Sequence, residues 1–306
     1  MAGMTHAVTI ENDIWRITLQ PELGGSVTSG EIRLGDTWQD VMRPSPADID
    51  DPRLSASYPL APWSNRIRDG VLTFNGRNYQ MRRNSVDGTA MHGAAWEYPW
   101  KVTAQTAQTV TLTFESTGLY GVNWPWNFSA TYTYALEGDT FVWTYSVTNI
   151  DEEPFPAGFG SHPYFQRQVA GSTDALLTTH VSAAYALDAG MADAPAGEIR
   201  TEADFREQRP LGPGGVDDCF TGRTGKELAH IEWPGAVQLD IAADADLTHA
   251  VLYIPVGRDY WAFEPVSHVN NGFALAAAGQ ADTGIFVLEP GETRTTSFTM
   301  RAHGMN

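Results

Sequence analysis

The strongest constraint on the fold is the alternation of apolar and polar residues in short stretches along most of the chain. The clearest pair covers residues 130–136 and 141–147, with a Glu-Gly-Asp turn at 137–139 between them. A period of two sends successive side chains to opposite faces of a β-strand, and the aromatic and β-branched residues in these stretches suit a half-buried sheet. The two stretches therefore predict a pair of antiparallel strands joined by a tight turn.

Similar patterns predict strands over most of the sequence. Hairpins are expected at 8–19, with the turn at 11–13, and at 71–81, where Asn75 and Gly76 form a dipeptide typical of tight β-turns. The pair Gly24 and Gly25 suits a turn or a close backbone approach. Further strands are predicted at 102–116 with a break at 105–108, and at 237–241, 250–254, 261–264, 284–288 and 295–300.

Helical signals are weak. No window of a dozen residues combines a 3.6-residue apolar period with helix caps, and the best short candidate is 203–208. Charged residues make up only 18% of the chain, and long apolar faces favour two packed sheets. We expect an all-β sandwich of antiparallel strands with very little helix. We also expect one domain over residues 1–306, because nothing marks the Gly/Pro loop at 210–215 as a linker.

Charge and cysteine content exclude several classes of partner and site. The net charge is −18, lysine occurs only at Lys101 and Lys226, and no basic run exists, so a nucleic-acid partner is not expected. Cys219 is the only cysteine, which excludes an intrachain disulfide and a CxxC metal cluster and favours a packing role. There is no apolar run of about 20 residues for a membrane span. The N-terminal stretch also lacks the pattern of a signal peptide. The sequence predicts a soluble, cytoplasmic protein.

His162 is the first candidate for chemistry. It lies in the run 158–165, before Pro163 and beside Tyr164 and Phe165, and Pro156 and Pro163 together predict a stiff bend between strands. An imidazole has an unperturbed pKa of about 6.5, so it can exchange a proton near neutral pH. A purely structural histidine in an aromatic setting is the alternative.

Four other stretches combine polar groups, turn residues and aromatics. They contribute Asn65 and Arg66, His92, Asp217, and Glu264. Glu264 follows an aromatic strand and is predicted to lie at its end, where an apolar setting raises the proton affinity of a carboxylate. Structural readings stay open for each: Arg68 competes with Arg66, Asp217 and Asp218 could be a solvated pair, and His92 could be a loop histidine.

The remaining histidines receive fewer roles. His268 could line the same site as Glu264. No role is assigned to His6, His180, His230, His249 and His303.

Five motifs, in order, carry a family resemblance. They are the Pro-Trp-Ser-Asn-Arg-Ile run at 62–67, Met-His-Gly at 91–93, Ser-His-Pro-Tyr-Phe at 161–165, Val-Asp-Asp-Cys-Phe at 216–220 and Glu-Pro-Val-Ser-His at 264–268. Together they resemble the aldose 1-epimerases, or galactose mutarotases, and look more like the shorter bacterial branch than like the galactose enzymes proper. The run at 269–272 departs from the pattern common in the family.

The resemblance implies a β-supersandwich that interconverts the α and β anomers of a free sugar without a metal or other cofactor. It implies that Glu264 is the general base and His162, as imidazolium, the general acid. Arg66, His92 and Asp217 would hold the sugar, with Asn65 beside them. Aromatic residues such as Trp63, Trp96, Tyr164 and Phe263 would offer stacking surface. Whether the protein is a monomer or a homodimer is left open.

Other functions remain compatible with these residues. A sugar-binding or sensing protein could use the same scaffold without catalysis. A glycoside hydrolase needs two carboxylates about the scissile bond, which Asp217 and Glu264 could supply. A metal site built from His92, His162 and acidic partners is a further alternative.

Overall fold

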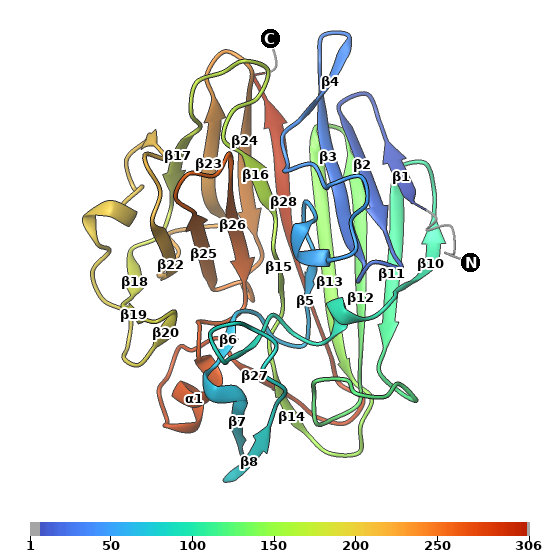
Figure 1. Ribbon diagram of the computed structural model, residues 1–306, viewed down its shortest axis with the longest axis vertical. Coiled ribbons are helices and arrows are strands. Elements are labelled where there is room, and N and C mark those ends of the chain that lie inside the picture. The colour runs from blue at the N-terminus through green and yellow to red at the C-terminus, as the bar shows by residue number, and fades with distance from the viewer. Residues whose placement is uncertain (1–6, 305–306) are drawn as a thin grey trace.

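The computed structural model describes residues 7–304, so His6 and the other residues of 1–6 and 305–306 lie outside it. Its largest element is an antiparallel sheet of nine strands (Figure 1). In spatial order the strands are β10 (Lys101–Gln105), β11 (Thr109–Glu115), β12 (Phe128–Glu137), β13 (Thr140–Asn149), β28 (Thr293–His303), β24 (Val237–Ala243), β23 (Glu227–Trp233), β17 (Leu176–Thr179) and β21 (Arg209–Pro210).

Two more sheets pack against this one. The seven-stranded sheet contains β18 (Ala183–Tyr185), β22 (Val216–Thr221), β25 (His249–Ile254), β26 (Tyr260–Val266), β15 (Gly160–Ser161) and β5 (Pro59–Leu60), with β16 (Tyr164–Gln166) also paired to β26. The four-stranded sheet contains β1 (Val8–Glu11), β2 (Trp15–Gln20), β3 (Ser26–Leu34) and β4 (Thr37–Asp40). A bridge between Met42 and Phe165 joins the two, which lie side by side in Figure 1.

Small pairs and short helices complete the described chain. The pairs are β6 (Arg66–Ile67) with β9 (Ala90–Met91), β7 (Val71–Phe74) with β8 (Arg77–Gln80), β14 (Phe155–Ala157) with β27 (Phe286–Leu288), and β19 (Leu187–Asp188) with β20 (Met191–Ala192). The only α-helix in residues 7–304 is α1 (Gly272–Ala277). Four 3₁₀ turns are η1 (Pro52–Leu54), η2 (Arg68–Gly70), η3 (Ala95–Glu97) and η4 (Thr201–Ala203). No helix in these residues is long and apolar enough to cross a membrane.

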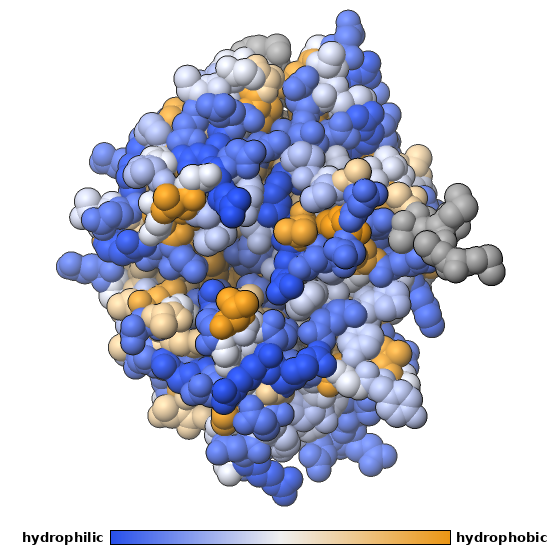
Figure 2. All heavy atoms as spheres, in the orientation of Figure 1, coloured by the Kyte–Doolittle hydropathy of each residue, from blue (hydrophilic) through white to orange (hydrophobic). Residues whose placement is uncertain are grey.

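The core lies between the layers. Trp15 of β2 packs on Phe141 of β13 with ring centroids 5.7 Å apart, and Phe165 of β16 packs on Trp233 of β23 at 6.5 Å. Each large apolar side chain buried in this way contributes roughly 1.5–3 kcal/mol. The face shown in Figure 2 is mainly hydrophilic, and apolar residues form only small groups on it. This distribution agrees with the net charge of −18.

The sequence predictions for the sheets are confirmed: the fold is an all-β sandwich, and both predicted hairpins and the strand pair β12–β13 are present. Gly24 adopts a φ of +62°, and a Cβ there would lie 2.1 Å from the Trp96 carbonyl oxygen, so the close backbone approach explains the glycine. Cys219 is buried, as expected of a packing residue, and burial raises the pKa of its thiol.

Three details differ from the predictions. The helix expected at 203–208 is absent, because the Asp204 carboxylate accepts hydrogen bonds from the backbone and side chain of Arg206 and so competes with helical pairing. The real helix, α1, begins at Gly272, the last residue of the run 269–272 that departs from the family pattern. The sequence also predicts that the strand ends at Glu264, whereas β26 continues through Pro265 to Val266.

One hydrogen bond ties the two large sheets together close to His162. The Tyr132 hydroxyl, from β12, donates to the Gly160 carbonyl oxygen of β15 over 2.7 Å, and both groups are buried. Replacing Tyr132 with Phe removes this donor from the buried carbonyl, so we expect a loss of about 1–2 kcal/mol in the free energy of unfolding. Urea denaturation measures the loss. Tyr134→Phe is the control, since that hydroxyl has no hydrogen-bond partner among residues 7–304; an equal loss in both variants would contradict the role of the bond.

Candidate active site

A cavity of about 190 Å³ brings together all six residues predicted from the sequence. Its lining comprises Asn65, Arg66, His92, His162, Asp217 and Glu264, together with Arg53, Tyr58, Met91, Tyr164, Val251 and Tyr253. The cavity lies below the range of roughly 300–1,000 Å³ typical of pockets for drug-sized ligands. Its size and polar lining suit a small hydrophilic molecule.

The alternating pattern of β26 directs Glu264 into this cavity. Trp261 and Phe263 point into the core between the sheets, whereas Ala262 and Val266 belong to a second apolar cluster on the other face. Glu264 lies between those two residues and shares their face. The residue is 2% exposed, so the carboxyl group is almost completely removed from bulk water.

Sheet register places His162 opposite Glu264. Gly160 of β15 pairs with Val266, and Tyr164 of β16 pairs with Ala262, so the same register on both sides leaves His162 facing Glu264. Pro163 has no N–H to donate to a ladder, which accounts for the break between β15 and β16. His162 Nε2 lies 3.2 Å from Glu264 Oε1. A histidine and a glutamate separated by about a hundred residues in sequence are thus in contact.

Aromatic rings hold the imidazole from both sides. The ring of His162 stacks on Tyr164 with centroids 4.3 Å apart and on Tyr58 at 5.1 Å. The Arg43 guanidinium covers the Tyr164 ring at 3.6 Å. Tyr58 and Arg43 were not singled out by the sequence analysis, because they reach the site through tertiary contacts. Of the four aromatics expected to offer stacking surface, only Tyr164 lines the cavity, and Trp63 and Phe263 belong to the core.

Burial opposes charge on both members of the pair. It lowers the pKa of His162 well below its usual value, and the positive charges of nearby groups, including Arg43, add to the effect. Burial, followed by the negative charge of Asp217, raises the pKa of Glu264 well above its usual value. Burial therefore favours a neutral imidazole at His162, whereas the resemblance implies an imidazolium as the general acid.

Asn65 and His92 form a second pair across β6 and β9. Arg66 pairs with Met91, so the register puts Asn65 opposite His92, and both residues have a positive φ. The Asn65 backbone N–H donates to His92 Nδ1 over 3.2 Å, which leaves the ring proton on Nε2. Burial lowers the pKa of His92 to about 3, with Arg66 as a further cause. The next residue, Gly93, has to be glycine, because a Cβ at this position would lie 2.3 Å from the Ala61 carbonyl oxygen.

Arg66 is held in place by a residue that the sequence analysis missed. Its Nε donates to Asp87 Oδ2 over 2.9 Å and its Nη1 to Asn65 Oδ1 over 3.2 Å, while Nη2 lies 4.0 Å from Asp217 Oδ2. The competing Arg68 instead pairs with Asp193. An Asp-Gly pair at 87–88, four residues before the Met-His-Gly motif, was the available signal for Asp87.

The Asp217–Asp218 pair divides between two environments. Asp217 lines the cavity, and burial raises the pKa of its carboxyl group. Asp218 is buried on the other side of β22, where Arg200 donates to both of its carboxylate oxygens. The reading of the two as a solvated pair is therefore wrong. Successive residues of a strand point to opposite faces, so only one of the two reaches the site.

Residues after β26 support the cavity without lining it. His268 Nε2 accepts a hydrogen bond from the Ser64 backbone N–H over 3.0 Å, so this histidine connects the strand end to the Asn65–Arg66 segment. It does not line the cavity. The Asn271 backbone N–H, at the start of α1, donates to the Arg66 carbonyl oxygen over 2.9 Å.

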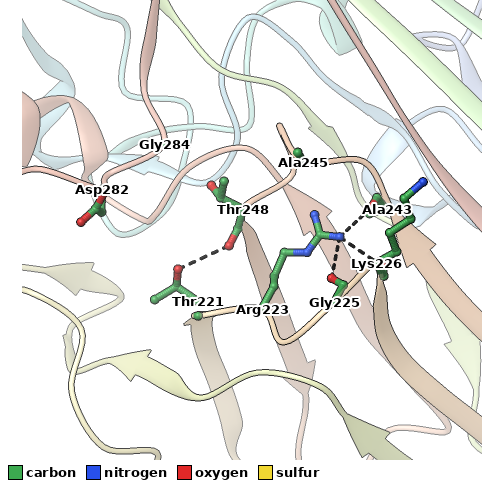
Figure 3. A pocket seen from close by; sticks show the side chains of 10 residues that line it. Thr221, Arg223, Gly225, Lys226, Ala243, Ala245, Thr248, Asp282 and Gly284 are labelled. Carbon is green, nitrogen blue, oxygen red and sulfur yellow. Dashed lines mark hydrogen bonds between the residues drawn. The ribbon is translucent and has the colours of Figure 1, made fainter.

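A second cavity and a separate cluster of histidine and aspartate side chains both lack the buried pair of His162 and Glu264. A larger cavity, of about 620 Å³, is shown in Figure 3. Its Arg223 donates to backbone carbonyl groups, among them those of Gly225, Lys226 and Ala243, and so braces a loop. Within residues 7–304, three metal-binding side chains come together only at His230, Asp240 and His303, and not at His92 and His162.

Comparisons with known proteins agree with this geometry. The family model described as aldose 1-epimerase matches residues 6–301. The chain is 26% identical to the Escherichia coli (strain K12) protein YphB over 258 residues, which are 81% of this chain and 83% of YphB. It is 31% identical to YihR of the same organism over 132 residues, which are 42% of each chain.

Solved structures share the fold. A galactose mutarotase-like protein from Clostridium acetobutylicum superposes with a TM-score of 0.84 at 18% identity, covering 98% of this chain and 95% of the other. A galactose 1-epimerase from Lactobacillus acidophilus NCFM superposes with a TM-score of 0.77 at 17% identity, covering 97% and 94%. Because the family model extends over nearly the whole sequence and these folds coincide, the chain belongs to the aldose 1-epimerase family.

Proposed function

We propose that the protein is an aldose 1-epimerase that interconverts the α and β anomers of a free aldose. The observation that carries the proposal is the contact of 3.2 Å between His162 Nε2 and Glu264 Oε1 at the wall of a small polar cavity. The two atoms that exchange protons in the reaction, the C1 hydroxyl oxygen and the ring oxygen, are bonded to the same carbon. Two adjacent groups can therefore serve both of them.

The reaction needs one base and one acid. Glu264 as carboxylate takes the proton of the C1 hydroxyl, and His162 as imidazolium gives a proton to the ring oxygen, so the C1–O5 bond breaks and an open-chain aldehyde forms. The aldehyde rotates about the C1–C2 bond, and the reverse transfers close the ring on its other face. Each positioned proton transfer contributes on the order of 10²–10⁴ in rate.

One proton shared between Glu264 and His162 is enough to produce both the base and the acid. Before a sugar binds, that proton resides on Glu264, because burial favours the neutral carboxylic acid and the neutral imidazole. Its transfer from Glu264 to His162 across the contact produces the carboxylate and the imidazolium together, without any change in net charge. Polar groups of a bound sugar stabilise this ion pair in place of water. The pair then titrates as one unit.

The other polar groups of the cavity bind hydroxyl groups of the sugar. His92 offers an Nε2–H donor and stays neutral, Asn65 offers an amide, and Asp217 offers a carboxylate that Arg66 faces. Neutral hydrogen-bond donors suit a neutral sugar. The guanidinium group of Arg66 adds charged N–H donors for those sugar oxygens that are the better acceptors. These residues fix the ring with respect to the acid–base pair.

The direct experiment is NMR exchange between the anomeric protons of several aldoses, with and without catalytic amounts of protein. We expect faster exchange for at least one aldose. Saturable binding without faster exchange would favour a sugar-binding protein on the same scaffold. Release of reducing sugar from oligosaccharides would favour a glycoside hydrolase that uses Asp217 and Glu264.

Removing either member of the pair should abolish catalysis. His162→Asn and Glu264→Gln each delete one proton-transfer group with little change of shape, so we expect kcat to fall by at least about 10²-fold in polarimetry on a fresh α-anomer. His180→Asn, at a partly exposed position after β17, is the matched control and should keep full activity. Full activity in either pair variant, with the fold intact, would refute the assignment.

The resting protonation state gives a separate prediction. Since burial raises the pKa of Glu264, its carboxyl group should still be protonated at pH 5.5, where an ordinary glutamate is about 90% ionised. Infrared difference spectra of the wild type against Glu264→Gln should show a carboxylic acid band at this pH. The band should disappear only at higher pH. A carboxylate band at pH 5.5 would contradict the one-proton pair.

A further inference from the structure

His230, Asp240 and His303 lie together on the face of the nine-stranded sheet that points away from the other layers. They come from three adjacent strands, β23, β24 and β28. His230 is directly opposite Asp240, and His303 is opposite Gln238, one pair along on the same face. Their sequence neighbours Ile231, Leu239 and Ala302 are buried in the core, whereas these three side chains are partly exposed.

The ligand atoms of the cluster are already close. His230 Nδ1 is 2.7 Å from Asp240 Oδ1, and His303 Nε2 is 2.9 Å from Asp240 Oδ2. All three groups offer one atom within 4.8 Å of the others. The two imidazole rings have centroids 5.7 Å apart.

A second observation concerns His303 alone. Its Nε2 is shielded from solvent and makes no regular hydrogen bond within the described residues, and Asp240 Oδ2 lies 2.9 Å from it. This carboxylate contact is the only interaction that these residues give the shielded nitrogen. A metal ion placed between the three groups would supply a partner.

Local charge favours a cation. The chain carries a net charge of −18, and Asp240 contributes a carboxylate between the two imidazoles. The nearest cation along β28, Arg301, extends to Asp139, with Nε 3.0 Å from Oδ2. Arg301 is therefore paired with Asp139. It lies on β28, on the opposite side of Asp240 from His230.

We propose that His230, Asp240 and His303 form a binding site for a divalent transition-metal ion such as Zn²⁺. Two imidazoles and a carboxylate are a ligand set that Zn²⁺ accepts, and three protein ligands leave one position for water. With metal–ligand bonds of about 2.0 Å, tetrahedral ligands are about 3.3 Å apart, and the three ligand atoms, which lie within 4.8 Å of one another, reach this spacing by shifts of about 1.5 Å or less. No element of the cavity at Glu264 takes part.

A metal ion at this site would stabilise the nine-stranded sheet at the C-terminal end of β28. His303 is the last residue of β28, the strand that joins β13 on one side to β24 on the other. An ion held at His303 and at β23 and β24 would connect three strands at this end. A ligand that binds only the folded state stabilises it.

Isothermal titration of chelator-treated protein with Zn²⁺ tests the proposal. We expect one saturable site with a dissociation constant on the order of 1 µM, and a higher thermal midpoint when Zn²⁺ is present. His303→Ala and His230→Ala should each weaken binding by tenfold or more and remove the thermal shift. His180→Ala, the control for a histidine outside the cluster, should bind as the wild type does.

Circular dichroism of the metal-free variants shows whether they are folded, and the expected mutarotase activity should be unaffected in them. Zn²⁺ affinity that is unchanged in folded His303→Ala would overturn the proposal, because the ion would then occupy another site, such as the cavity with His92 and His162. Absence of saturable binding below about 100 µM in the wild type would overturn it as well.

Discussion

The antiparallel register across β26 is the constraint on which the site depends. Strands β15 and β16 both pair with β26 in one register, and the interruption at His162 and Pro163 falls opposite Glu264. A shift of one residue in either segment would turn His162 or Glu264 towards the core, because side chains alternate between the faces of a sheet. Contacts with the nine-stranded sheet stabilise this register. The Tyr132 hydroxyl of that sheet donates a hydrogen bond to Gly160, and the large side chains of β26 fill the space between the sheets.

Burial then sets the chemistry of the pair. The rings of Tyr58 and Tyr164 exclude water from His162, and Glu264 is enclosed in the same cavity, so neither group favours its charged form. Two such groups in contact hold one proton between them, and its position decides whether the pair is neutral or ready to act as acid and base. His92 stays neutral for the same reason, which keeps a donor on its Nε2. The proposed activity follows from this environment and from the way that distant segments converge on it.

The sequence predicted most of the sheet structure, because alternation and turn residues are local signals, as in β12 and β13. It failed at 203–208, where a side-chain contact of Asp204 replaced helical pairing, and it missed α1, which is too short to show a period. All six proposed site residues were found through motifs, but motifs alone did not decide between Arg66 and Arg68 or between Asp217 and Asp218. Those choices depend on which face of a strand points to the cavity and on which carboxylate each arginine meets. Asp87 had only its Asp-Gly pair as a local signal, and Tyr58 and Arg43 act through tertiary contacts.

A crystal structure of the Glu264→Gln variant with a bound aldose tests the central claim most directly. The account predicts that the sugar occupies the cavity of about 190 Å³, with the ring oxygen within hydrogen-bond distance of His162 Nε2 and the C1 hydroxyl beside the substituted side chain. The remaining hydroxyl groups should contact Arg66, His92 and Asp217. A sugar bound with C1 turned to solvent, or bound in the larger cavity near Arg223, would contradict the assignment of His162 and Glu264 as the acid–base pair.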